Sequence, residues 1–291
     1  SNLAIMGLLN RQRTAIAGEV LFKGRDLLTL PPDQLRHIRG KEIAMVFQDP
    51  FACLHPMYRV GTQIQEAVLA HQDVGKDRAW ARAVELLGHV GIPNAKSRAR
   101  DYPHQFSGGM RQRAMIAMAL VHNPDILICD EPTTALDVTV QAQIIELIEE
   151  VKREFDIGVI LVTHDLGVVA ETANSVMVMY AGRIMEYGPA EAIFDRPQHP
   201  YAWGLLDSMP SIEVRLDALV PIDGSPPSLL APPSGCPFHP RCRYRFEPCP
   251  IERPPLTAPA PEAHLDACHL SWDEKQREGA KRSVKRLGEA A

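Results

Sequence analysis

The 291-residue sequence lacks the features that mark several common protein classes. No apolar run approaches the roughly 18 residues that a membrane-spanning helix needs, and the first residues do not have the pattern of a secretory signal. Basic residues are not in excess, because the formal net charge is -5, and this argues against general nucleic-acid binding. A sustained heptad pattern is also missing. We therefore expect a globular protein without long coiled coils that reaches a membrane only through a partner.

The composition is that of an ordinary globular protein, with 45% hydrophobic and 23% charged residues. A chain of this length has room for one large domain or two modest ones and can bury a substantial core. The first residue is Ser1 rather than Met, and residues 3–9 read like the interior of a helix. We therefore expect the chain to be N-terminally incomplete.

Apolar periodicity predicts an α/β fold. Short apolar runs at 43–47, 125–129 and 158–163 predict strands, and the longer amphipathic stretch 138–155 predicts a helix. Strands that alternate with helices of this length indicate a largely parallel sheet covered on both faces. Apolar spacing typical of helices also predicts a helical subdomain over about 55–122. Further along, a hairpin is expected through Ala181 and Gly182.

The character of the sequence changes near residue 211. From 221 to 261 prolines are dense and cysteines cluster, and the residues from 273 onward are strongly charged. We predict a main domain over 1–210, a small irregular cysteine-rich extension over 211–270, and a charged tail over 271–291.

A serine-glycine-glycine turn is expected to begin the helix that runs from 109 to about 121. Ser107 can act as the N-cap, and Gly108 and Gly109 allow close approach of another backbone or a ligand. Free amides and the helix dipole together form an anion site at such a terminus. A simple N-cap without a ligand is the alternative interpretation.

Two adjacent carboxylates, Asp130 and Glu131, end the next apolar strand. Carboxylates at the carboxyl edge of a parallel sheet can meet a ligand there. Phosphoryl transfer uses such groups to hold magnesium and to orient the attacking water. The alternative is a strand that ends in a solvated acidic turn.

Together, residues 106–113 (FSGGMRQR) and 126–132 (ILICDEP) resemble the ATP-binding cassette (ABC) ATPases, which sandwich ATP between two such subunits. The resemblance implies an ABC-type P-loop ATPase domain with a mixed sheet and a helical subdomain. It implies that Asp130 supports Mg²⁺ through water and that Glu131 polarises the attacking water. It also implies that Ser107, Gly108 and Gly109 contact ATP bound by the opposite subunit.

Three further residues match the pattern of this family. Gln48 follows a predicted strand and resembles the Q-loop glutamine, which reaches the magnesium and the attacking water. His164 follows the strand at 158–163 and resembles the switch histidine, which contacts the γ-phosphate. Asp137 belongs to a segment, Ala135-Leu136-Asp137, that resembles the D-loop, which signals across the dimer. A polar loop residue at Gln48 and a structural histidine at His164 are the alternatives.

The phosphate-binding loop of the family, G-x-x-x-x-G-K-S/T, has no match in the sequence. Residues 40–42 and 75–77 carry a Gly-Lys pair without the glycine spacing or the hydroxyl. We therefore expect this chain alone to be inactive as an ATPase. A non-catalytic assembly or metal-binding module is the alternative to the enzyme.

The six cysteines fall into two groups. Cys53 and Cys129 stand apart, and we expect them to be inert packing residues. The other four are spaced Cys-x5-Cys-x6-Cys-x18-Cys, which is not the C-x2-C pairing of common zinc ribbons. This spacing leaves an iron-sulfur cluster, structural zinc, two disulfides and free thiols open. The four residues are Cys236, Cys242, Cys249 and Cys268.

The ATPase motifs, residues 196–201 (RPQHPY) and the proline-cysteine region together resemble the ATPases of oligopeptide/dipeptide importers. That resemblance covers residues 1 to about 270. It implies a 4Fe-4S cluster on the four clustered cysteines, with zinc as the alternative, besides ATP and Mg²⁺.

The same resemblance implies the partners and the location of the protein. Expected partners are a second ABC ATPase subunit, two transmembrane permease subunits and an extracytoplasmic peptide-binding protein, with no nucleic acid. The protein would lie at the cytoplasmic face of the cell membrane, as a peripheral subunit. Another cargo, such as nickel, is an alternative to peptides. A DNA-repair ATPase is disfavoured, because such proteins carry long coiled coils.

Overall fold

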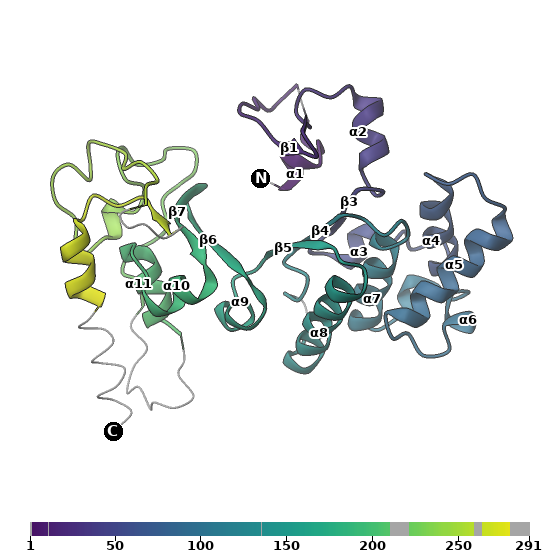
Figure 1. Cartoon of the computed structure of the whole chain (residues 1–291). Coiled ribbons are helices and arrows are strands. Elements are labelled where there is room, and N and C mark those ends of the chain that lie inside the picture. The colour runs from purple at the N-terminus through teal and green to yellow at the C-terminus, as the bar shows by residue number, and fades with distance from the viewer. Residues whose placement is uncertain (1, 11, 135, 210–220, 259–263, 280–291) are drawn as a thin grey trace. The chain divides into compact units, whose positions relative to one another are not determined.

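The computed structural model describes residues 2–10, 12–134, 136–209, 221–258 and 264–279 (Figure 1). The chain divides into two compact units, Ser1–His164 and Asp165–Ala291, which are described separately. In the described residues, no helix is both long and apolar enough to cross a membrane. The domain boundary predicted near residue 210 adjoins residues 210–220, which lie outside the described part of the chain.

A three-stranded parallel sheet, in the order β3-β4-β5, forms the centre of the first unit. Its strands are β3 (Ile43–Val46), β4 (Ile126–Asp130) and β5 (Gly158–Val162), which confirms the predicted strands. β3 is buried along its whole length, and β4 is buried except at its two ends. β5 is different, because Ile160 and Val162 remain 41% and 37% exposed.

The expectation of a sheet covered on both faces is therefore wrong at β5. This strand pairs with β4 along one side, and no described strand of the first unit pairs with its other side. The exposed residues alternate along β5, so one face of this strand is not covered within the first unit.

Helices surround this sheet and form the predicted helical region. α8 (Val138–Glu154) follows β4 and buries one apolar stripe, because Ile144, Leu147, Ile148 and Val151 recur at helical spacing. α7 (Gly108–Ala119) packs against both β3 and α8. In Figure 1, α4 (Val60–Leu69), α5 (Lys76–His89) and α6 (Ala95–Arg98) lie together at one end of this unit. The short helices α3 (Pro50–Cys53) and η1 (Pro103–Gln105) complete the region.

The N-terminal segment packs on the sheet through a small apolar cluster. Met6, Leu27 and Leu35 are buried against Ile43 and Ile128. The segment contains α1 (Asn2–Ile5), β1 (Leu21–Phe22), β2 (Arg25–Asp26) and α2 (Pro32–Ile38). The helix expected over residues 3–9 ends early, at Ile5, and Gly7 follows with φ +59°.

The second unit is built on the predicted hairpin. β6 (Ser175–Tyr180) and β7 (Arg183–Pro189) pair antiparallel, and Ala181 and Gly182 both have positive φ, as a tight two-residue turn requires. β8 (Leu265–Asp266) adds to β7 as a third strand. The described helices of this unit include α9 (Leu166–Thr172), α10 (Ala190–Asp195) and α11 (Pro200–Asp207), and residues 272–279 are helical as well.

Within residues 221–258 the chain is largely irregular, as its proline content predicts, with one short helix, η2 (His239–Arg241). It is held by a buried aromatic cluster rather than by a core of its own. Phe238 packs edge-on against Tyr180 of β6, with ring centroids 5.3 Å apart, and also contacts Tyr201 of α11. The Arg241 guanidinium donates hydrogen bonds to the backbone oxygens of Ile222 and Asp223. The cysteine-rich region therefore folds onto the hairpin.

Candidate functional site

Glu131 stands immediately after β4 in a strained backbone conformation. Its φ is +45°, in the left-handed region that non-glycine residues rarely adopt, at a cost of about 1–3 kcal/mol. Its backbone N–H donates to the carbonyl oxygen of Val162, 2.9 Å away, and this bond fixes the residue against the end of β5. Strain of this kind persists only where the surrounding structure enforces it, and it concentrates at functional sites.

Three side chains converge on the Glu131 carboxylate. The Gln48 amide and the Thr134 hydroxyl both donate to Oε2, each at 2.9 Å. His164 Nδ1 lies 3.6 Å from Oε1. The structure thus brings together Gln48, Glu131 and His164, which stand in three separate parts of the sequence. We call these three residues and Thr134 the Glu131 cluster.

Thr134 is the member of the Glu131 cluster that sequence reasoning missed. A hydroxyl three residues after a carboxylate is a common turn feature and is no functional signal by itself. The two donors hold one carboxylate oxygen in place, and the other oxygen faces the imidazole of His164.

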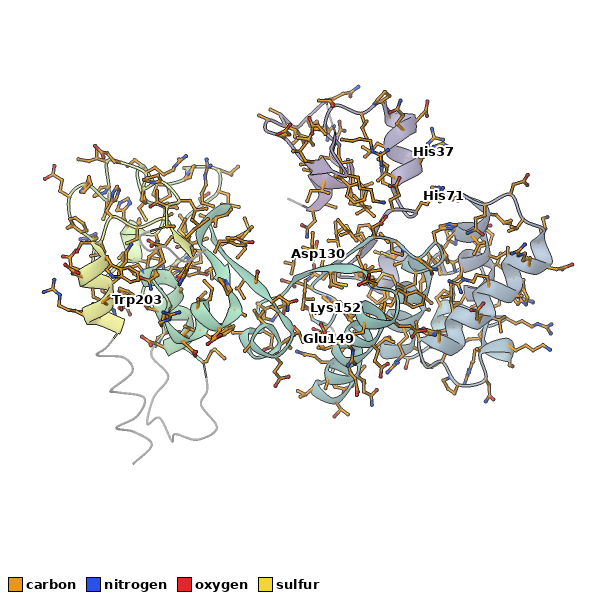
Figure 2. The ribbon with its side chains drawn as sticks, viewed as in Figure 1. His37, His71, Asp130, Glu149, Lys152 and Trp203 are labelled. Atoms are coloured by element: carbon orange, nitrogen blue, oxygen red, sulfur yellow. The ribbon has the colours of Figure 1, made fainter. Side chains whose placement is uncertain are left out.

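The Glu131 cluster is exposed to solvent, and its side chains carry several oxygen atoms that could bind a metal ion. The His164 side chain is 72% exposed and that of Glu131 is 30% exposed, so a ligand can reach both. Asp130, labelled in Figure 2, is the last residue of β4 and is half-buried. Carboxylate and amide oxygens are the ligands that Mg²⁺ prefers, so Asp130, Glu131 and Gln48 fit a magnesium site.

The serine-glycine-glycine turn forms the predicted N-terminus of α7. The Ser107 hydroxyl accepts a hydrogen bond from the Met110 amide at 3.3 Å. Packing of α7 on α8 also favours glycine at position 109, because a Cβ there would lie 2.6 Å from Cγ1 of Val140 on α8. At Gly108 the nearest side-chain atom, from Leu136, would be 3.5 Å away, an ordinary contact. The described hydrogen bonds and ion pairs do not join this turn to the Glu131 cluster.

Asp137 is the N-cap of α8 and accepts a hydrogen bond from the Val140 amide at 3.0 Å. Of the predicted D-loop, Ala135 lies outside the described residues. The geometry thus accounts for Asp137 as a capping residue, and its signalling role stays a prediction.

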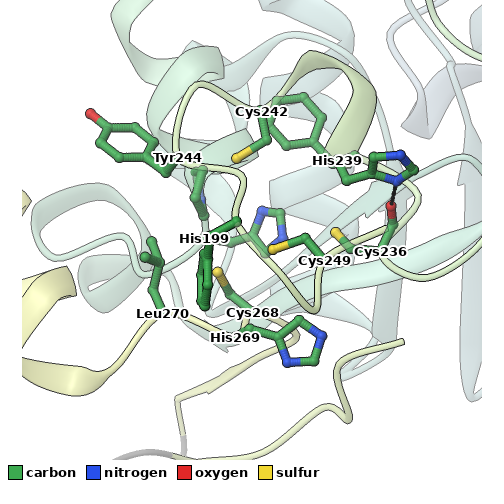
Figure 3. A pocket seen from close by; sticks show the side chains of 12 residues that line it. His199, Cys236, His239, Cys242, Tyr244, Cys249, Cys268, His269 and Leu270 are labelled. Atoms are coloured by element: carbon green, nitrogen blue, oxygen red, sulfur yellow. Dashed lines mark hydrogen bonds between the residues drawn. The ribbon is translucent and has the colours of Figure 1, made fainter. Parts of the chain in front are cut away.

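The second site lies in the other unit, where the four clustered cysteines line one pocket (Figure 3). We call it the thiol pocket; His199, His239 and His269 line it as well. All four cysteines are free thiols, so disulfide pairing is absent among them. Gly235, with φ +60°, lets the chain pass closely over the backbone of Cys249, and the Cys236 amide donates to the Cys249 carbonyl at 2.9 Å.

Backbone amides point at three of the four sulfurs. The residue two positions after each of these cysteines supplies such an amide: Phe238 for Cys236, Tyr244 for Cys242 and Leu270 for Cys268. The amide of His239 also acts on Cys236. Such N–H donors stabilise a thiolate over a thiol. Burial acts in the opposite direction and prevails, because it raises the pKa of Cys242 to about 11 and that of Cys268 to about 12. The Cys242 and Cys268 thiols are therefore neutral at pH 7 unless a positively charged group draws off their protons.

No three His, Cys, Asp or Glu side chains of the described residues are close enough together to hold a single metal ion. The predicted metal ligands are thus gathered in one pocket, but not at the spacing of a mononuclear site. A zinc ion with Zn–S bonds of about 2.3 Å needs its thiolates about 4 Å apart. In a cubane cluster each thiolate binds a different iron, so the sulfurs stand farther apart. The choice between an iron-sulfur cluster and zinc stays a prediction.

The two isolated cysteines are at least partly buried, and their inert role stays a prediction. Cys129 lies in the middle of the sheet with no exposed surface, and burial raises the pKa of its thiol to about 12. Cys53 is half-buried at the end of α3, and burial raises its pKa as well. A thiol with a raised pKa is a poor nucleophile, which agrees with an inert role.

Comparison with known proteins defines the class of protein. Residues 4–134 match the family model for the ABC transporter ATPase domain. The solved structure of the ATP-binding cassette MJ0796, a dimer bound to ADP and Pi, superposes with a TM-score of 0.56 at 26% identity. That match covers 65% of this chain and 80% of the cassette. The fold is that of an ABC-type ATPase.

The particular family follows from the second unit and from close relatives. Residues 185–249 match the family model named oligopeptide/dipeptide transporter, C-terminal region. The oligopeptide transport ATP-binding protein OppD of Haemophilus influenzae is 52% identical over 93% of this chain and 83% of its own length. The dipeptide transport ATP-binding protein DppD of Bacillus subtilis is 50% identical over 94% of this chain and 81% of its own length. The chain belongs to the oligopeptide/dipeptide family of ABC transporter ATP-binding subunits.

Proposed function

We propose that this chain is the ATP-binding subunit of an importer and couples ATP hydrolysis to the uptake of dipeptides or oligopeptides. The observation that carries the proposal is the Glu131 cluster, in which Gln48 and His164 meet one strained carboxylate. Relatives at about half identity that are named for oligopeptide and dipeptide transport support the cargo class. Another cargo, such as nickel, is the alternative.

Within this function Glu131 is the general base. Its carboxylate accepts hydrogen bonds at Oε2, which leaves Oε1 to orient and polarise a water that attacks the γ-phosphate. The exposed His164 imidazole, on the Oε1 side, contacts the γ-phosphate. Asp130 and Gln48 would hold Mg²⁺, which would neutralise charge on the phosphates.

A second ATPase subunit completes each nucleotide site. The N-terminus of α7, with Ser107, Gly108 and Gly109, offers free amides and the positive end of a 12-residue helix to ATP held by that subunit. Asp137 caps α8, whose Val140 packs on Gly109, so it connects the carboxylate strand with the turn that meets the partner's nucleotide.

The remaining partners follow from the importer function. They are two transmembrane permease subunits and an extracytoplasmic peptide-binding protein, and the chain works at the cytoplasmic face of the membrane as a peripheral subunit. No helix among the described residues could cross the bilayer by itself.

These 291 residues by themselves should hydrolyse ATP poorly, because no G-x-x-x-x-G-K-S/T run is present to hold the phosphates. If ATP hydrolysis by the importer that contains this chain did not depend on the Glu131 cluster either, the alternative of a non-catalytic assembly module would be supported.

We also propose that the thiol pocket holds a 4Fe-4S cluster on Cys236, Cys242, Cys249 and Cys268. Four free thiols in one pocket, with backbone amides near three of the sulfurs, support a thiolate-held metal centre here, and zinc is the alternative to the cluster. When bound, the group would supply a cross-link between chain segments that have little apolar core of their own.

The test of the ATPase function is Glu131→Gln in the assembled importer. Without the base, turnover should fall at least a hundredfold while ATP binding is kept, measured by phosphate release and by binding of a fluorescent nucleotide. Glu150→Gln, an exposed glutamate on α8, makes the same charge change and should leave turnover unaltered. Full turnover in Glu131→Gln would remove Glu131 as the base.

A further inference from the structure

His199 is a fully buried histidine that lines the thiol pocket, and only 1% of its surface is exposed. It precedes α11 and acts as its N-cap, because Nδ1 accepts a hydrogen bond from the Tyr201 amide at 3.0 Å. Its own backbone N–H donates to Glu186 Oε2 at 2.9 Å. Two interactions therefore fix both the backbone and the ring.

The other ring nitrogen, Nε2, is buried and has no hydrogen-bond partner in the described structure. Burial lowers the pKa of the imidazole, and the backbone of Ala267 opposes this as a weak hydrogen-bond partner, although it does not meet the distance and angle of a hydrogen bond to Nε2. A buried polar group without a partner costs free energy, so native proteins seldom leave one unless something else binds there.

The hydrogen bond that His199 accepts as the N-cap of α11 determines the tautomer of its ring. A nitrogen that accepts a hydrogen bond carries no proton, so the proton of the neutral imidazole is on Nε2. Nε2 is then a donor, and it has no lone pair to offer a metal. His199 can thus give a hydrogen bond to an acceptor in the pocket, but it cannot be a metal ligand through this nitrogen.

The other two histidines of the pocket are already engaged. His239 Nδ1 bonds the carbonyl of Cys236 at 2.9 Å, and His269 Nε2 bonds the carbonyl of Glu252 at 3.0 Å. Figure 3 shows the His199 imidazole among the cysteine side chains, while His269 lies at the rim of the group. The unsatisfied donor and the four sulfurs therefore share one buried space.

We propose that His199 donates a hydrogen bond from Nε2 to a sulfur of the group held by the four cysteines. The inference rests on the proposed 4Fe-4S cluster, whose sulfides and thiolates are negative acceptors in an apolar site. His199 is in this view a positioning residue: it aligns the group and stabilises its more negative, reduced state.

The test uses the full chain, reconstituted anaerobically with iron and sulfide. His199→Asn keeps a side-chain oxygen that can cap α11 but has no donor at the Nε2 position. His269→Asn is the matched control, because it removes a histidine of the same pocket that already has a partner. Both variants should bind iron and sulfide. His199→Asn should show a more negative reduction potential in a dithionite titration, and His269→Asn the potential of the wild type.

A second measurement does not depend on folding of the variant. In wild-type protein labelled with ¹⁵N only in the imidazole rings of histidine, pulsed EPR of the reduced cluster should show one weak nitrogen coupling, which His269→Asn retains. A strong coupling would mean direct ligation, and an absent one would mean no contact; either result overturns the role of His199. An unchanged potential in His199→Asn overturns it too, while the cluster stands. Wild-type protein that takes up no iron and sulfide would instead overturn the cluster itself.

Discussion

A buried ion pair in the second unit gives the sharpest stability prediction. Lys275 Nζ donates to both carboxylate oxygens of Asp266, at 2.7 and 2.9 Å, and the two side chains are only 4% and 1% exposed. Residues 272–279 are helical, so the pair connects this C-terminal helix to β8. Lys275→Met keeps much of the apolar stem and removes the charge.

Removing one partner of a buried pair leaves the other charge desolvated and unpaired, which costs about 3–5 kcal/mol. We expect the free energy of unfolding of the second unit to fall by about that amount in Lys275→Met, measured by urea denaturation with Trp203 fluorescence. Trp203 is fully buried in this unit and reports its packing. Arg277→Met, on the exposed side of the same helix, should cost less than about 0.5 kcal/mol.

The loss of stability in Lys275→Met should also depend on pH, and the burial of Asp266 determines in which direction. Burial raises the pKa of Asp266, and Lys275 partly opposes this, so removal of Lys275 raises the folded-state pKa further. The folded variant then binds a proton more tightly than the unfolded chain does. Its stability therefore falls as pH rises from the unfolded pKa of 3.8 through the folded pKa, and recovers as pH is lowered through that range.

Two outcomes would refute this reasoning. One is an unfolding free energy of Lys275→Met within about 0.5 kcal/mol of the wild type, the range of ordinary surface substitutions. The other is a deficit that stays constant from neutral to acidic pH. A double variant, Lys275→Met with Asp266→Asn, should regain part of the loss, because it no longer buries an unpaired charge.

Two further predictions concern the first unit. Gly109→Ala should destabilise it by about 1–3 kcal/mol because the added methyl collides with Val140, whereas Gly108→Ala should cost under about 1 kcal/mol; equal midpoints in thermal unfolding would contradict this. Thr134→Val removes one of the two donors to Glu131 and should lower the ATPase rate of the assembled importer at unchanged thermal stability; a rate equal to that of the wild type would show that Gln48 alone positions the carboxylate.

Local sequence patterns predicted the elements that position the first site. The apolar runs of β3 and β4 and the long stripe of α8 are visible in the sequence because each is regular over its own length. The hairpin of β6 and β7 has the same basis, together with its Ala181-Gly182 turn. The exposed face of β5 was not predictable, because an apolar strand has the same sequence whether or not another element covers it.

Several features of the two sites depend on contacts between residues that are far apart in the sequence, and local patterns did not predict them. The convergence of Gln48 and His164 on Glu131 was expected through family resemblance, but the strained φ of Glu131 and the hydroxyl of Thr134 were not. No spacing rule reports a left-handed residue at a strand end. Likewise, the cysteine spacing indicated a ligand set, but the buried His199 with its unsatisfied nitrogen appears only once α11 is in place.

The thiol pocket is part of the hairpin unit rather than an appended module, and Glu186 of β7 is the reason. Glu186 has no exposed surface, and burial raises the pKa of its carboxyl. It accepts hydrogen bonds from the backbone amides of Gln198 and His199 and bonds the ring of His264, at 2.6 to 2.9 Å. A single β7 carboxylate thus holds the cap of α11 and the residue that leads into β8.

The preceding residue of β7, Met185, also connects the hairpin to the cysteine-rich region. The Met185 carbonyl accepts a hydrogen bond from the Ala267 amide, directly beside Cys268. The segment that carries Cys268 is therefore fixed to the hairpin by a backbone hydrogen bond and by the Asp266–Lys275 pair. Because these contacts are buried and mutually dependent, the hairpin, α11 and the described cysteine-rich residues should unfold together. Loss of any group bound to the four sulfurs should then lower the stability of β6 and β7 as well as that of the loops that carry the cysteines.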